Sequence, residues 1–120
     1  MAEQAGASDC IFCRIGRGEL GTKFVGESEG AVAFYDLQPQ APTHVLIVPR
    51  RHVASLDELT EDDAAMIGDL LLLAAQVARR EGIADRGYRV LTNVGADAGQ
   101  SVHHLHFHLL GGRQMHTSLA

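Results

Sequence analysis

Residues 104–112 read HLHFHLLGG, so three imidazoles alternate strictly with apolar side chains before a pair of glycines. In an extended strand successive side chains point to opposite faces, and residues two apart share one face. His104, His106 and His108 are therefore expected on one face, and the hydrophobic residues between them on the other. The pattern predicts a strand whose apolar face is buried and whose other face presents a row of titratable groups.

The composition describes an ordinary globular protein. Of 120 residues, 46% are hydrophobic and 21% are charged, so we expect one folded domain over residues 9–120 after a flexible tail at residues 1–8. The formal net charge of −5 argues against sequence-independent nucleic-acid binding, which needs a basic surface to displace counterions. The longest aliphatic stretch, residues 70–75, is too short to span a bilayer, and a signal-peptide pattern is missing, so we expect a cytoplasmic protein outside the membrane.

Local patterns predict an α+β fold. A short N-terminal helix is expected over residues 11–15, and a long amphipathic helix is expected to open at a capping box on Thr60 and to run to about Arg80. The expected strands are residues 22–27, 31–35, 44–48, 88–93 and the histidine strand. Because one long helix interrupts the run of strands, we expect an antiparallel five-stranded sheet backed by that helix.

Two cysteines, Cys10 and Cys13, form a CxxC motif. A structural disulfide is unusual in the cytoplasm, and a redox pair needs a thioredoxin-like context that this N-terminus lacks. Metal ligation is therefore the leading interpretation, and zinc needs two imidazoles beside the two thiolates. We favour His52 and His104 in a structural site. An alternative stays open at this point: His104 and His106, at HxH spacing, can be ligands of a catalytic zinc.

A second cluster lies directly upstream of the histidines. Glycine allows a close backbone approach, so the N–H groups from Gly99 to Ser101 are candidate donors to an anion, together with the Gln100 amide and the Ser101 hydroxyl. Asp36, at the end of the second strand, is a candidate acceptor for ribose hydroxyls and equally a turn residue. A phosphate-bearing ligand beside the histidine row is therefore expected to be held locally.

Taken together, these motifs resemble the histidine triad (HIT) superfamily. Residues 100–110 look like its signature of three histidines alternating with apolar residues, and residues 40–49 match the segment that carries the family's fourth histidine, here His44. The tail GGRQM at residues 111–115 resembles the Hint-like branch of histidine triad nucleotide-binding proteins, in its zinc-bearing CxxC type. The match covers about residues 9–116. It departs from that branch in two respects: the chain has no tryptophan, and it carries a CxxC that some close Hint relatives lack.

The resemblance implies a HIT-like homodimer whose sheets join edge to edge, with a purine nucleotide in a shallow cleft on each subunit. The implied activity is that of a purine nucleoside phosphoramidase or nucleotidyl hydrolase. It proceeds through a covalent nucleotidyl-histidine intermediate and releases AMP or GMP from phosphoramidates or related conjugates. The alternatives are a dinucleoside polyphosphate hydrolase of the same superfamily and a non-catalytic nucleotide-binding zinc module.

The resemblance also implies roles for individual residues. His106 is the implied nucleophile, His108 orients it through its backbone carbonyl, and His44 and Ser101 surround the phosphate and the leaving group. The residues implied to bind the nucleotide are Ile11, Phe12, Asp36, Leu37, Asn93, Gly99, Gln100, Ser101, His106 and His108. The implied ligands of a structural Zn²⁺ are Cys10, Cys13, His52 and His104.

Overall fold

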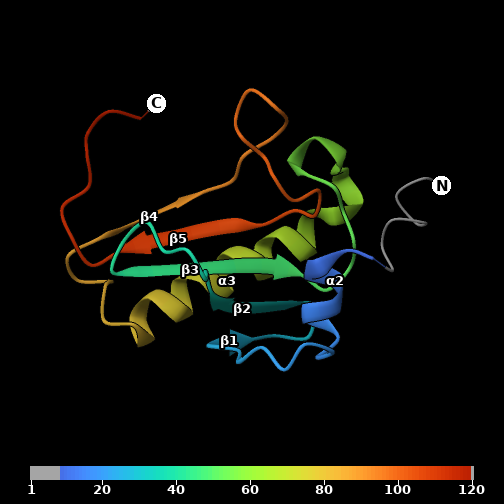
Figure 1. The fold of residues 1–120 in the computed structure, drawn as a ribbon, viewed down its shortest axis with the longest axis horizontal. Coiled ribbons are helices and arrows are strands. Elements are labelled where there is room, and N and C mark those ends of the chain that lie inside the picture. Colours follow the sequence, from blue (N-terminus) through green and yellow to red (C-terminus); the bar gives the residue numbers. More distant parts are fainter. Residues whose placement is uncertain (1–8, 120) are drawn as a thin grey trace.

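The computed structural model describes residues 9–119, so the tail expected at residues 1–8 lies outside the described residues. One sheet contains the strands β1 (Gly26–Glu27), β2 (Ala31–Tyr35), β3 (Thr43–Pro49), β4 (Tyr88–Leu91) and β5 (Phe107–Gly111). Their order is β1-β2-β3-β5-β4, and every neighbouring pair is antiparallel (Figure 1). The predicted five-stranded antiparallel sheet is confirmed.

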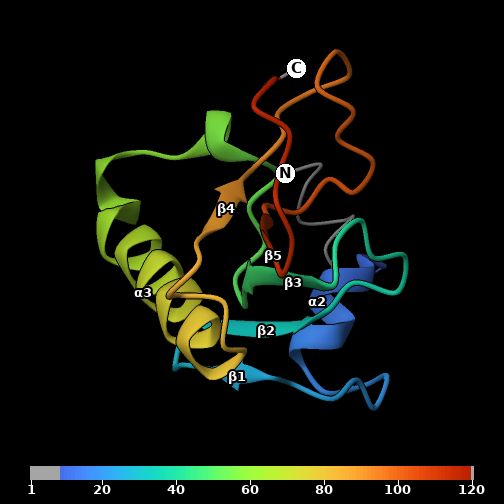
Figure 2. The same ribbon diagram turned by 90° about the vertical axis from the view of Figure 1, so that its left-hand side faces the viewer.

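Two α-helices cover this sheet from opposite sides. The helix α2 (Ile11–Gly16) follows the N-cap Cys10, and the long helix α3 (Ala64–Arg80) follows two 3-10 turns at Leu56–Glu58 and Glu61–Asp63. The capping box is present, because the Thr60 side chain caps the turn and Asp63 Oδ2 accepts from the Thr60 N–H at 2.9 Å. Figure 2 shows α3 on one side of the sheet and α2 on the other. Within residues 9–119, no helix combines the length and the apolarity that crossing a membrane would take.

The central strands are buried on both faces, and their alternation divides the core in two. Ala33 and Ile47 join the cluster beneath α3, while Phe34 and Leu46 join the cluster beneath α2. Burial on both faces explains why these strands are continuous hydrophobic runs in the sequence. The cluster beneath α2 forms the floor on which the candidate site is built.

The histidine segment differs from its prediction in one respect. The strand β5 begins at Phe107, so His104 and His106 lie in the irregular segment before it. Since Ile47 pairs with Phe107, a longer strand would pair Pro49 with Leu105, and proline has no N–H for the ladder. The alternation survives without the ladder. The hydrophobic residues that alternate with the histidines join the α3-side cluster: Leu105, Phe107 and Leu109.

The first strand is also shorter than predicted, because only Gly26 and Glu27 pair with β2. A Cβ at Gly26 would lie 2.8 Å from Val77 Cγ2, so glycine is what lets α3 cross this sheet edge closely. Before this point the chain runs outside the sheet, from the end of α2 toward β1 (Figure 1). The strand β4 likewise ends at Leu91 rather than at residue 93.

Candidate active site and candidate metal centre

A cavity of about 440 Å³ lies on the α2 side of the sheet and contains two of the triad histidines. Its lining residues are Ile11, Phe12, Ile15, Thr22, Phe34, Tyr35, Asp36, Leu37, Gln38, Leu46, Ser101, Val102, His106 and His108. Seven of the ten residues predicted to bind a nucleotide are therefore brought together here. The other three, Asn93, Gly99 and Gln100, lie outside this lining.

The ring of His106 is buried and held from several sides. Its Nδ1 lies 2.7 Å from the carbonyl oxygen of His104. Because a carbonyl can only accept, Nδ1 carries a proton, and in the uncharged ring the lone pair is therefore on Nε2. Phe12 and His108 both pack against the ring, each with a centroid distance of 5.1 Å. The geometry thus fixes the tautomer of the uncharged ring and leaves Nε2 as the nitrogen without a backbone partner.

The carbonyl that orients this ring belongs to His104, which corrects the role implied for the backbone of His108. His108 lies inside β5, where its neighbours are Leu46 of β3 and Leu91 of β4. The carbonyl of His104 lies before the strand, outside both ladders, and is available to a side chain two residues on.

The third triad histidine is linked to the histidine of β3. The backbone N–H of Gln40 donates to His44 Nδ1 at 3.0 Å, and His44 Nε2 lies 2.9 Å from His108 Nδ1. Since an amide N–H can only donate, a neutral His44 has its proton on Nε2 and donates it to His108 Nδ1. A neutral His108 then carries its own proton on Nε2.

Burial keeps both of these rings neutral. It lowers the pKa of His44, although the nearby Asp36 carboxylate opposes the shift. Burial, followed by the neighbouring His106 and His44 rings, lowers the pKa of His108 to about 4. The pair is therefore uncharged at neutral pH, and His108 Nε2–H is a neutral hydrogen-bond donor at the cavity.

Asp36, His44 and His108 also bring one nitrogen or oxygen atom each within 4.8 Å of one another. This group does not fit a metal ion, because the nitrogen that His44 turns toward its neighbours carries the proton. The carboxylate Oδ2 of Asp36 lies 3.4 Å from that nitrogen, farther than the 2.9 Å to His108 Nδ1.

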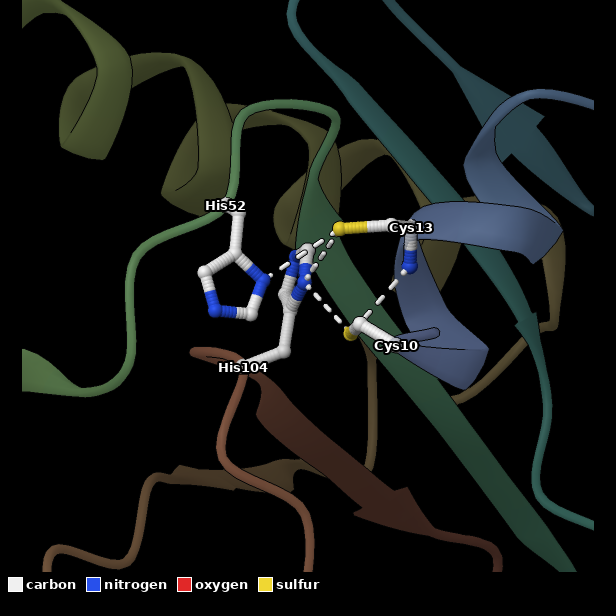
Figure 3. A group of neighbouring side chains, drawn as sticks. All are labelled: Cys10, Cys13, His52 and His104. Carbon is white, nitrogen blue, oxygen red and sulfur yellow. Dashed lines mark hydrogen bonds between the residues drawn. The ribbon is translucent and has the colours of Figure 1, made fainter. Parts of the chain in front are cut away.

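A second group, Cys10, Cys13, His52 and His104, surrounds one point between α2 and the segments that follow β3 and precede β5 (Figure 3). Its four donor atoms lie within 4.8 Å of one another. His104 Nδ1 is 3.3 Å from Cys10 Sγ, and His52 Nδ1 is 3.3 Å from Cys13 Sγ. The Cys13 N–H donates to Cys10 Sγ at 3.4 Å, so the start of α2 turns both sulfurs to the same side.

The donor set fits zinc. His104 Nε2 lies 2.8 Å from the Pro49 carbonyl and must donate to it, so the lone pair of Nδ1 faces the sulfurs. Tetrahedral zinc at about 2.3 Å from sulfur and about 2.1 Å from nitrogen places these atoms about 3.6 Å apart, close to the distances found. Burial, followed by the contact with Cys10, raises the pKa of the Cys13 thiol to about 11, so a cation is what would hold it as a thiolate.

The alternative zinc site at HxH spacing is not supported by this geometry. His104 turns its free nitrogen toward the sulfurs, and the Nδ1 of His106 is bound to a carbonyl. The two rings therefore do not converge on one point as ligands, although they are two residues apart.

The glycine loop before the histidines uses most of its predicted anion donors internally, which corrects its predicted role. The backbone N–H groups of Gly99 and Gln100 donate within the turn at 3.0 and 3.1 Å. The Gln100 side chain accepts from the Gly95 N–H at 2.9 Å and donates to the carbonyls of Ala54 at 2.8 Å and Val102 at 3.0 Å. Tight turns satisfy their own backbone groups first. Gln100 therefore braces the loop, and Ser101 is the member that reaches the cavity.

Sequence reasoning missed three groups that shape the site. The Gln40 N–H and the Pro49 carbonyl fix the tautomers of His44 and His104, and both act through the backbone, which leaves no side-chain signal. The Thr92 hydroxyl donates to the His106 carbonyl at 2.7 Å. The sequence signal for that contact is weak: Thr92 is a polar β-branched residue near the end of the strand predicted over residues 88–93.

Comparisons with known proteins agree with this architecture. Residues 17–115 match the model of the HIT domain family. The chain is 39% identical over 114 residues to the purine nucleoside phosphoramidase of Escherichia coli. The aligned region covers 95% of this chain and 96% of that protein. It superposes on a HIT family hydrolase from Clostridium thermocellum with a TM-score of 0.90 and 44% identity, covering 93% of this chain and 97% of that chain. It also superposes on a HIT family hydrolase from Legionella pneumophila with a TM-score of 0.87 and 44% identity. That match covers 90% of this chain and 96% of that chain.

Proposed function

The chain belongs to the HIT domain family, and from this membership and its site geometry we propose that it is a purine nucleoside phosphoramidase of the Hint-like branch. Its substrates would be phosphoramidates or related conjugates of AMP or GMP. The observation that carries the proposal is the buried His106 ring, whose Nδ1 binds the His104 carbonyl and whose Nε2 keeps a lone pair beside a cavity.

The proposed reaction begins with attack by His106. Its Nε2 forms a bond to the phosphorus, the P–N bond to the amine breaks, and the electron pair leaves on the amine nitrogen. That nitrogen takes a proton from water through the Ser101 hydroxyl, which lines the cavity. The ring becomes cationic, and the His104 carbonyl stabilises the charge through Nδ1–H.

Hydrolysis of the intermediate completes the cycle. Water attacks the phosphorus, the P–Nε2 bond breaks, its electron pair returns to His106, and the proton of the water goes to solvent. One phosphoramidate and one water thus give one nucleoside monophosphate and one amine. His108 Nε2–H would donate to a non-bridging phosphate oxygen, and this donor becomes stronger as charge develops in the transition state.

The cavity lining supports an assignment of the nucleotide. Its apolar members Ile11, Phe12 and Leu37 would contact the base, and Asp36 would accept from the ribose hydroxyls. Asp36 Oδ1 already accepts from the Gln38 N–H at 2.8 Å, which fixes the orientation of the carboxylate. We propose that Gly99 and Gln100 support the backbone of Ser101 and do not contact the nucleotide directly. Asn93 would also make no contact with the nucleotide.

We propose that Cys10, Cys13, His52 and His104 hold a structural Zn²⁺. When bound, zinc supplies a cross-link between α2 and the segment before β5, with all four positions taken by protein ligands. His104 would then have two tasks, because its ring contributes to the metal centre and its carbonyl orients His106. Two reduced cysteines in such a set suit the reducing cytoplasm, where we propose that the protein acts.

The edge of the sheet supports a homodimer. Within the described residues β4 pairs with β5 alone, so its outer edge offers unpaired backbone groups. The long helix beside it exposes Leu71 and Leu72 at 44% and 66%. We propose that two copies join edge to edge through β4, which would cover this apolar surface as well.

Intact-mass measurement after brief mixing with an adenosine phosphoramidate tests the proposal. We expect a nucleotidyl adduct in the wild type and none in His106→Ala, whereas His116→Ala, which removes an exposed histidine, should still form it. Turnover of a dinucleoside polyphosphate in preference to the phosphoramidate would favour the hydrolase alternative. Binding of AMP with no adduct and no turnover would leave a nucleotide-binding module and overturn the enzyme.

A further inference from the structure

The segment after β5 packs against the loop between β2 and β3. Gly112 has a φ of +96°, and a Cβ at this position would lie 2.9 Å from Pro42 Cβ. Arg113 Nη2 donates to the carbonyl oxygen of Gln40 at 2.9 Å. Two independent contacts thus hold residues 36–42 from the C-terminal side, although neither Gly112 nor Arg113 belongs to the lining of the cavity that contains His106.

The same loop residue controls the histidine pair. The carbonyl oxygen of Gln40 accepts a hydrogen bond from Arg113, and the N–H of Gln40 donates to His44 Nδ1 at 3.0 Å. Pro39 and Pro42 fix φ on either side of Gln40, which leaves the loop few ways to adjust. A contact made outside the cavity therefore reaches His44 and, 2.9 Å further on, His108.

We propose that Gly112 and Arg113 are positioning residues that set the tautomers of His44 and His108. By holding the loop at Gln40, they keep the Gln40 N–H on His44 Nδ1. That contact leaves the His44 proton on Nε2 and the His108 proton on the Nε2 that can donate into the cavity. The consequence for catalysis rests on the proposed function, in which this N–H meets a phosphate oxygen.

The opposite tautomers of His44 and His108 show what the contacts of Gly112 and Arg113 with the loop prevent. Without the Gln40 contact, only the Asp36 carboxylate, 3.4 Å from His44 Nε2, still favours a proton on that nitrogen. His44 can then carry its proton on Nδ1, and its Nε2 accepts from His108 Nδ1–H. His108 would present a lone pair to a phosphate oxygen, and the two would repel. A single hydrogen bond of about 1 kcal/mol shifts such a balance about fivefold.

The tautomers can be measured directly in the ligand-free protein by long-range ¹H–¹⁵N correlation of labelled imidazoles. We expect Nε2–H forms for His44 and His108 in the wild type and in Arg113→Lys, which keeps a donor. Arg113→Met should give mixed tautomers for both rings. Arg89→Met is the matched control, because Arg89 also donates to a carbonyl of the tail, that of His116 at 2.9 Å. An Nδ1–H form of His44 in the wild type, or an unchanged spectrum in Arg113→Met, would overturn the proposal.

Ligand affinity separates positioning from simple loop damage. We expect Arg113→Met to bind AMP about twofold more weakly, because about half of the molecules would then carry the donating tautomer of His108. Adenosine should bind as tightly as to the wild type, and Arg113→Lys should restore AMP binding. Equal weakening of both ligands would mean that the loop has lost its shape around Asp36 and Leu37, and the proposal would fail. A wild-type protein that binds neither ligand would overturn the proposed function instead, and the tautomer spectra would then decide the positioning role alone.

Discussion

Replacing Gln100 with alanine tests whether this residue braces the glycine loop or binds phosphate. Its side chain makes three hydrogen bonds, one from the Gly95 N–H and two to the carbonyls of Ala54 and Val102. Each is worth about 1 kcal/mol, so the sum is about 3 kcal/mol. The side chain is only half-buried, and water can replace part of these bonds. We therefore expect Gln100→Ala to lower the free energy of unfolding by about 2 kcal/mol.

Urea and thermal denaturation measure this effect. For a domain of this length a loss of about 2 kcal/mol lowers the melting temperature by about 8 °C. Gln76→Ala is the matched control, since Gln76 is exposed on α3, and we expect its change to stay within about 0.5 kcal/mol. The AMP affinity of Gln100→Ala should fall only through displacement of Ser101. Unchanged stability together with a large loss of AMP affinity, but not of adenosine affinity, would show that Gln100 contacts the phosphate and would refute the reasoning.

Three further predictions follow from the site. His106→Ala should lower turnover by a factor on the order of 10⁴ because the covalent route is lost, while titration should show that AMP still binds. Cys10→Ser combined with Cys13→Ser should abolish bound zinc in elemental analysis and lower the melting temperature, whereas full metal content would exclude this ligand set. Because the folded-state pKa of His108 is lowered from 6.5 to about 4, its effect on stability is nil above pH 6.5. The free energy of unfolding should fall by at most about 1.4 kcal/mol per pH unit as the pH drops toward 4, and urea titrations should find a shallower slope in His108→Gln.

Periodic patterns in the sequence predicted much of the fold. The period of two in residues 104–109 assigns side chains to faces whether or not the chain is hydrogen-bonded in a ladder. Leu105 therefore lies in the core and His104 on the other face even though β5 begins at Phe107. The long helix was predicted from apolar spacing and from the capping residue Thr60, both of which are local properties.

The sequence also predicted which residues meet at the candidate metal centre, because cysteine and histidine are few and carry specific chemistry. Residue type and the family resemblance point to Cys10, Cys13, His52 and His104, and the structure brings all four together. The glycine loop was a weaker signal. A turn rich in donors looks the same in sequence whether the donors face a ligand or satisfy the turn itself.

Only the tertiary structure decided the protonation pattern of the site. His106, His104 and His44 each have one ring nitrogen fixed by a backbone group: the His104 carbonyl, the Pro49 carbonyl and the Gln40 N–H. Every residue except proline carries the same backbone donor and acceptor, so such a contact leaves no mark in the sequence. The sequence by itself determined which imidazoles are present and which face they share. The fold determined which nitrogen of each ring is free to react, to bind a metal or to donate.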